Sequence, residues 1–231
     1  MQNCDWARID ILGFILLSAM VTGVHSADAQ DNRLYAGVSG MLSTQGSVVP
    51  GEGSSIPTSG VGGTAMGISG EFGTFLKPAL SLAFEASVPA RFESIQRTGI
   101  PNSQKDQRHR DLVFSGLFHI HTTPAGPIRV GLVAGPTVIR EDTLQRVAYA
   151  PFGSVNFGPY GPETSLTRWT VGLTVGADIG VQVSPNVQIV PQIRLHWVER
   201  ASLESGNDNA SAFLGLTSWV IRPAVGVRVS F

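Results

Sequence analysis

The feature that most constrains this chain is a strict alternation of apolar residues with small or polar ones, sustained over long segments. The C-terminal stretch shows it clearly, with apolar residues at Trp219, Ile221, Pro223, Val225, Val227, Val229 and Phe231. The intervening positions include Arg222, Gly226 and Arg228. Because successive side chains of a β-strand point to opposite faces, such a strand lies between an apolar surrounding and a polar one.

Eight segments of the chain alternate in this way, and the connections between them fall into two classes. The expected strands are 33–43, 64–76, 79–92, 111–122, 127–140, 166–183, 187–199 and 219–231. Long loops are expected at 44–63, 93–110, 141–165 and 200–216, and short turns at 77–78, 123–126 and 184–186. Strict alternation of long and short connections is typical of an up-and-down antiparallel barrel whose rims face different compartments.

The composition favours a membrane over water as the surrounding of the apolar faces. Only 14% of the residues are charged, against about 25% in a typical soluble domain. Beyond the N-terminal segment, no apolar run approaches the ~20 residues of a spanning helix. Within hydrocarbon, only helices and closed barrels pair every backbone group. We therefore predict an all-β fold, an eight-stranded antiparallel up-and-down transmembrane β-barrel, with a soluble all-β fold as the alternative.

Aromatic residues are expected near the ends of the strands, where interfacial girdles form in membrane barrels. They are Phe92, Trp169, Trp197, Trp219 and Phe231.

The first 29 residues have the pattern of a secretory signal peptide. An apolar run at 11–24 precedes the small-x-small sequence Ala27-Asp28-Ala29, which predicts cleavage near Ala29 and a mature start at Gln30. A single membrane anchor is the alternative, but the run is shorter than the ~20 residues that span a bilayer. Residues 30–231 then form the barrel domain. Cys4, the only cysteine, lies within the leader, so the mature barrel has no disulfide and no cysteine metal ligand.

Taken together, the leader, the eight amphipathic strands and the terminal Val227-Arg-Val-Ser-Phe231 resemble the small outer-membrane β-barrel proteins of Gram-negative bacteria, the OmpA/OmpX-like group. The resemblance covers residues 30–231 and is one of pattern rather than of a motif. It implies a location in the cell outer membrane after export, among outer-membrane lipids and lipopolysaccharide. It also implies that the barrel-assembly machinery reads the terminal strand, at Val227, Val229 and Phe231.

Charged residues on the small-residue faces point to a closed interior. An eight-stranded barrel is just wide enough for its interior to be filled by side chains, and charges placed there must pair or remain hydrated. Five of them are expected near mid-height, with Arg228 and His119 nearer the periplasmic rim. We predict that these five form an Arg–carboxylate network that plugs the lumen, with a gated ion path as the alternative: Glu71, Glu85, Asp178, Arg194 and Arg222.

Catalytic and metal chemistry receive weak support from the sequence. His119 and His121 share a strand face, as a metal pair would, but the sequence places no carboxylate beside them, and we expect a hydrated rim pair. A lipid hydrolase would need a reachable serine, whereas Ser115 lies on the lumen face. Neither catalytic residues, nor a metal site, nor a cofactor is therefore predicted.

Partners are constrained by charge. The formal net charge of −1 argues against nucleic acid, whose partners usually carry a basic excess. Lys105, Arg108 and Arg110 lie at the junction of a long loop with a strand, where they could contact lipopolysaccharide phosphates. We expect a non-enzymatic protein with a structural or surface-interaction role through four long extracellular loops. The alternatives are a small gated pore and, less favoured, a lipid-A-modifying enzyme, and the sequence names no extracellular partner.

Overall fold

The computed structural model of the chain describes residues 34–47, 62–97, 103–122, 127–151, 156–199 and 216–231. The expected signal peptide lies outside these residues. No helix among the described residues is long and apolar enough to cross a membrane. The strands are β1 (Leu34–Ser47), β2 (Gly63–Lys77), β3 (Leu80–Pro89), β4 (Phe92–Arg97), β5 (Ser103–His121), β6 (Ile128–Tyr149), β7 (Thr164–Ser184), β8 (Val187–Val198) and β9 (Leu216–Ser230).

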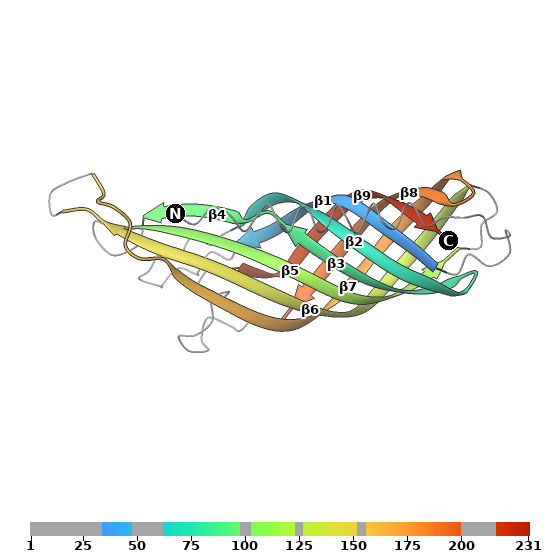
Figure 1. The fold of residues 1–231 in the computed structure, drawn as a ribbon. Coiled ribbons are helices and arrows are strands. Elements are labelled where there is room, and N and C mark those ends of the chain that lie inside the picture. The colour runs from blue at the N-terminus through green and yellow to red at the C-terminus, as the bar shows by residue number, and fades with distance from the viewer. Residues whose placement is uncertain (1–33, 48–61, 98–102, 123–126, 152–155, 200–215) are drawn as a thin grey trace.

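These strands form one closed antiparallel sheet in the order β3-β2-β1-β9-β8-β7-β6-β5-β4, and β3 also pairs with β5 (Figure 1). Because β3 and β4 are successive parts of one stave along β5, the nine described strands make eight staves. The barrel closes between β1 and β9, where Tyr35 pairs with Ser230 and Met41 with Ala224. The predicted eight-stranded up-and-down transmembrane barrel is confirmed.

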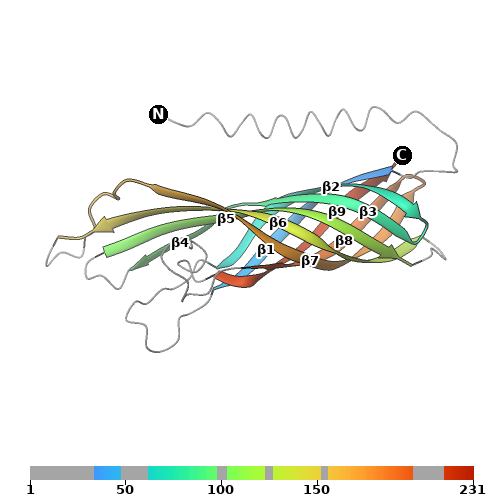
Figure 2. The same ribbon diagram turned by 90° about the horizontal axis from the view of Figure 1, so that it is seen from below.

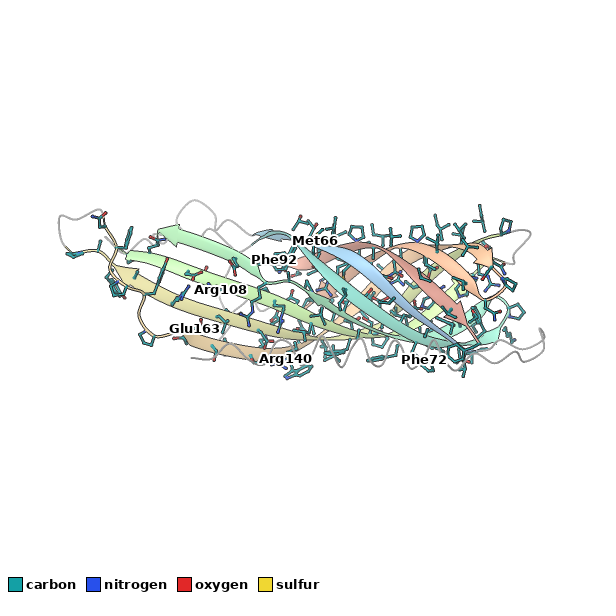
Figure 3. All side chains as sticks on the ribbon, turned by 45° about the horizontal axis from the view of Figure 1, so that its top comes forward. Met66, Phe72, Phe92, Arg108, Arg140 and Glu163 are labelled. Atoms are coloured by element: carbon teal, nitrogen blue, oxygen red, sulfur yellow. The ribbon has the colours of Figure 1, made fainter. Side chains whose placement is uncertain are left out.

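The barrel is apolar outside and polar inside, the reverse of a soluble protein. Large apolar side chains such as Met66 and Leu132 are 75% and 64% exposed on the exterior. Figure 3 shows Met66 and Phe72 on the outside of the barrel. Arg194 and Asp178, each 1% exposed, lie within. Since exposed apolar surface on this scale belongs in hydrocarbon rather than in water, the alternative of a soluble all-β fold is wrong.

Two of the three expected short turns are present, at Pro78–Ala79 between β2 and β3 and at Pro185–Asn186 between β7 and β8. The third, at 123–126, lies outside the described residues. Residues 48–61 and 200–215, within two expected long loops, do so as well.

The expected loops at 93–110 and 141–165 are wrong in large part, because strand structure continues into both. β4 and the first half of β5 occupy the first, and the end of β6 occupies much of the second. Together they project from the barrel at one end, and the start of β7 runs beside β6 as far as the pairing of Gln145 with Thr164 (Figures 1 and 2). We call this projecting part the extension, defined as Phe92–Arg97, Ser103–Arg110 and Glu141–Tyr149. Most of its described outward residues are polar, with Leu144 as an apolar exception, so the apolar alternation weakens there although the hydrogen-bonded ladder continues.

Phe92 departs from the expected aromatic girdle and is buried, whereas Trp169, Trp197, Trp219 and Phe231 lie exposed on the exterior. The register gives the reason. Ser87 pairs with Val113 and Phe92 with His109, so the path along β3 and β4 has one residue more than the path along β5. One extra residue moves every later side chain to the opposite face of the strand.

Candidate functional site

The centre of the barrel interior is a cluster in which one guanidinium joins two carboxylates. Nη2 of Arg228 lies 2.9 Å from Oε2 of Glu71 and 3.0 Å from Oδ2 of Asp178. The His119 ring lies between the same two acids, with Nε2 3.5 Å from Glu71 Oε1 and Nδ1 3.4 Å from Asp178 Oδ2. Strands β2, β5, β7 and β9 thus meet through charged side chains across the lumen.

Glycines make room for these large side chains. Gly37 of β1 pairs with Glu71 on one side and with Arg228 on the other. Since Gly37 has no side chain, the acid and the guanidinium of the two flanking strands can meet across it. A Cβ at Gly131 would overlap a carboxylate oxygen of Asp178. The small residues on the inward faces of the strands therefore leave the space that the charged side chains occupy.

A second ion pair lies beside the first. Arg194 of β8 donates from Nε to Oε2 of Glu85 at 3.0 Å and from Nη2 to Oε1 of Gln192 at 3.0 Å. Its Nη2 also lies 4.0 Å from Oδ2 of Asp178, which connects the two ion pairs. Of the five predicted network residues, Glu71, Glu85, Asp178 and Arg194 therefore fall into one connected cluster with Arg228.

Arg222 and Arg228 have roles that differ from those the sequence predicts. Arg228, expected near the periplasmic rim, is the cation that bridges the acids. Arg222 is fully buried and donates from Nε to Ser43 Oγ at 3.1 Å, from Nη1 to Ser87 Oγ, and from Nη2 to the Asp111 carbonyl at 3.0 Å. Strand patterns in the sequence do not give the register, and it is the register through Gly37 that sets Arg228 beside Glu71.

The interior histidines are not a hydrated rim pair, so that expectation is wrong. His119 is fully buried and has carboxylates on both sides. His121 Nε2 lies 2.9 Å from Ser81 Oγ, which in turn lies 3.2 Å from the Tyr35 hydroxyl. The Arg228 guanidinium stacks on the Tyr35 ring at 4.8 Å. The polar network thus continues from the ion pairs towards the rim with the short turns.

Ser115, the serine weighed as a hydrolytic nucleophile, is buried in a group of hydroxyls. Its Oγ lies 3.0 Å from Thr137 Oγ1 and 3.2 Å from Thr174 Oγ1. Thr174 lies 2.7 Å from Nδ1 of His196. This arrangement places the serine inside the lumen, away from the lipid-facing surface.

The residues predicted to contact lipopolysaccharide lie on the extension, which Figure 3 shows with Arg108 labelled. Arg108 Nε lies 3.5 Å from Glu93, and Arg110 Nη2 lies 3.8 Å from Asp142. The side chain of Lys105 lies outside the described residues. Both described arginines therefore already have intramolecular acidic partners.

A further ion pair on the extension joins Arg146 Nε to Asp106 Oδ2 at 2.7 Å. The hydrogen bond to Asp106 raises the pKa of Arg146 above its usual range. Ion pairs on the extension thus include partly exposed arginines, unlike those at the centre of the lumen cluster.

The terminal residues predicted as the assembly signal face outward. Val227 and Phe231 are exposed on the exterior, and the Phe231 amide donates to the Leu34 carbonyl at 3.0 Å. Val229 pairs with Ala36 of β1 and with Val187 of β8. The terminal strand therefore presents an apolar face to its surroundings, while both of its edges are paired in the closed sheet.

Comparison with solved structures finds barrels of bacterial outer membranes. Neisserial surface protein A matches with 17% identity over 90% of this chain and 100% of that chain, at a TM-score of 0.43. Ail, the attachment invasion locus protein of Yersinia pestis, matches with 9% identity over 87% and 100%, at 0.44. The outer membrane protease OmpT from Escherichia coli matches with 11% identity over 91% and 100%, at 0.47. Comparison with protein-family models and with curated proteins gives no match.

Proposed function

We propose that this chain is an integral outer-membrane protein of a Gram-negative cell, with a sealed lumen and a structural or surface-interaction role performed by its extracellular end. The observation that carries the proposal is the ion-pair cluster across the interior. Arg228 bridges Glu71 and Asp178, and Arg194 binds Glu85. In a barrel of eight staves, side chains of this size suffice to fill the lumen.

The geometry of the cluster favours a plug over a gated path. A buried charge is costly unless it is paired, and short hydrogen bonds between charged groups are about twice as strong as neutral ones. An ion path through the centre would have to separate Arg228 from two acids at once. That requirement supports a static plug. A gated pore would instead show itself as conductance of the wild-type protein.

The extension supports the surface role. In barrels of this kind, short turns face the periplasm and long connections face the outside. The turn at Pro78–Ala79 lies at the end opposite to the extension (Figure 1), which supports an extracellular position for the extension. Polar, projecting segments held by a rigid scaffold are where binding residues are commonly found.

Contact with outer-membrane lipid is the second part of the proposal. On β5 the outward residues change from Leu112 to Arg110, and on β6 from Val138 to Arg140. Basic side chains at the edge of an apolar belt can bind the anionic head groups of lipopolysaccharide. Lys105, Arg108 and Arg110 keep this proposed role, and Phe231 keeps its proposed role in recognition by the assembly machinery.

Conductance of the refolded protein in planar bilayers tests the plug. We expect the wild-type protein to show no stable open events. The triple variant Glu71→Ala/Asp178→Ala/Arg228→Ala removes the bridged cluster from the lumen, and we expect it to conduct. Leu132→Ala, on the lipid face, is the matched control and should remain closed. Stable open events in the wild-type protein that change in Arg222→Ala would contradict the sealed lumen and establish a pore.

The enzymatic alternative has its own readout. Lipid A from cells that express the protein is compared by mass spectrometry with lipid A from cells that lack it. We expect identical lipid A, because Ser115 is enclosed by threonine hydroxyls inside the barrel. A modification that depends on the protein and disappears in His119→Ala would overturn the non-enzymatic assignment.

A further inference from the structure

A second cluster of titratable side chains lies at the extracellular end of the interior, separate from the ion pairs that form the proposed plug. His109 and Asp111 are two residues apart on β5 and therefore point to the same face. Glu141 of β6 is the register partner of Asp111. The ladder between β5 and β6 thus brings an imidazole and two carboxylates together inside the barrel.

The three side chains offer ligand atoms at coordinating range. One nitrogen or oxygen from each residue lies within 4.8 Å of the others. His109 and Asp111 are 0% exposed and Glu141 is 1% exposed. Three potential ligands from two paired strands, all withdrawn from bulk water, form a small pre-arranged donor set.

The imidazole provides an independent observation that points to a ligand. Its Nε2 lies 2.5 Å from Oδ1 of Asp111, yet no hydrogen bond satisfies this buried nitrogen among the described residues. A buried polar atom without a hydrogen bond is uncommon and calls for a specific explanation. A cation that takes both atoms as ligands supplies one, with the carboxylate turned to the wider spacing that two ligands of one metal ion need.

The other ring nitrogen is held as a metal-bound histidine requires. Nδ1 of His109 lies 3.2 Å from the Thr143 hydroxyl. If Nδ1 carries the proton and donates it to that oxygen, Nε2 keeps a lone pair directed at the two acids. Metal-bound histidines usually donate their second N–H in this way, which fixes the ring and its tautomer.

Arginine side chains nearby compete with a metal ion for the carboxylates. Arg168 Nε lies 4.0 Å from Glu141 Oε2, and Arg222 Nη2 donates to the carbonyl of Asp111 at 3.0 Å. The Arg168 side chain is 27% exposed and also reaches the Glu199 carbonyl at 3.4 Å. It can therefore turn towards solvent and give up its own contact with Glu141 when a metal ion binds.

We propose that His109 Nε2, a carboxylate oxygen of Asp111 and a carboxylate oxygen of Glu141 bind one divalent transition-metal cation of the Zn²⁺ type, with water completing the coordination. Imidazole nitrogen together with carboxylate oxygen suits Zn²⁺. Ca²⁺ and Mg²⁺ prefer ligand sets made of oxygen alone. The two carboxylates balance the charge of the ion within the barrel.

Metal titration of the refolded, untagged full-length barrel tests this site. After treatment with EDTA and its removal, we expect Zn²⁺ to bind with one saturable site by calorimetry, and Co²⁺ to give visible absorption bands. Asp111→Asn and Glu141→Gln should each weaken Zn²⁺ binding by about tenfold or more, because loss of even an outer-shell partner typically costs 10–100-fold. Arg168→Gln should strengthen binding, since it removes the competing cation.

Asp142→Asn is the matched control, because Asp142 is adjacent to Glu141 on β6 and points to the outer face. We expect it to bind Zn²⁺ as the wild-type protein does. Heat-modifiable gel mobility establishes that each variant is a folded barrel before titration. The proposal is overturned if the folded wild-type protein shows no saturable Zn²⁺ binding. It is equally overturned if Asp111→Asn and Glu141→Gln, both folded, bind as tightly as the wild-type protein.

Discussion

The barrel wall and the extension share strands β5 and β6, but their outward side chains differ in polarity. Along β5 from Leu112 to Ile120, the large outward side chains are apolar, whereas the inward ones alternate between apolar and polar, as in Val113, Ser115, Leu117 and His119. Beyond Leu112, in the extension, the outward side chains are Arg110 and Arg108, and the ladder with β6 continues. Backbone pairing is thus the same in both regions, whereas the polarity of the outward side chains indicates whether lipid or water surrounds the strand.

Ion pairs in the two regions differ in their exposure to solvent. Inside the barrel wall, Arg228 and Asp178 are 3.0 Å apart and both are buried. On the extension, Arg146 and Asp106 are 2.7 Å apart, but the arginine side chain is 34% exposed. Similar distances therefore carry different energies, because solvent screens one pair and not the other.

The largest expected effect comes from breaking the buried pair. Arg228→Ala leaves Glu71 and Asp178 with one cationic partner fewer in a buried site, and we expect a loss of about 3–5 kcal/mol in the free energy of unfolding. Urea unfolding of the protein refolded into lipid vesicles, followed by tryptophan fluorescence, measures it. Asp106→Asn, which breaks the pair on the extension, is the comparison and should leave the unfolding midpoint unchanged. Equal shifts for the two variants would remove the distinction between wall and extension.

A charge placed on the outward face should give the next largest effect. Leu132 lies on the exterior of β6 within the apolar belt and is 64% exposed. We expect Leu132→Arg to destabilise the barrel by about 2–4 kcal/mol, because arginine is costly in the hydrocarbon core. Leu144→Arg, on the same strand within the extension, should cost much less. The same vesicle unfolding experiment compares them, and a larger cost for Leu144→Arg would place the membrane boundary elsewhere.

The smallest expected effect concerns the boundary itself. The Trp169 ring lies 6.3 Å from the Phe114 ring on the exterior, at the level where Arg140 pairs with Trp169 across β6 and β7. Trp169→Ala should cost about 0.5–1.5 kcal/mol through the lost aromatic contact, in addition to lost burial in the interface. Tyr149→Ala at the tip of the extension should have no measurable effect on unfolding. A cost for Tyr149→Ala that matches Trp169→Ala would show that the tip is embedded as well.

The same contrast explains how much of the fold the sequence predicts. Alternation identifies the wall because lipid outside and charge inside impose a period of two on every stave. It fails at β4 and the first half of β5, where both faces carry polar residues. It also fails at Phe92, because one additional residue near Ala90 and Arg91 reverses the side-chain direction and leaves no sign in composition.

The candidate site is predicted less completely for a related reason. Charge and strand face identify Glu71, Glu85, Asp178 and Arg194 as interior residues, and the structure brings them together. Whether Arg222 or Arg228 meets the acids depends on register across three strands. The same applies to His109, Asp111 and Glu141, since only the pairing of β5 with β6 brings Glu141 to the other two.

In the proposed orientation, the continuous pair of strands β5 and β6 passes from lipid into the extracellular space near Leu112 and Arg140. Single cysteines test it directly in intact cells, in a Cys4→Ser background that removes the only natural cysteine. A membrane-impermeant maleimide is added to cells that carry Leu132→Cys or Leu144→Cys. We predict rapid labelling at position 144 and protection at position 132. Labelling of position 132, or protection of position 144 in a folded barrel, would show that the β5–β6 pair does not leave the lipid between these two positions.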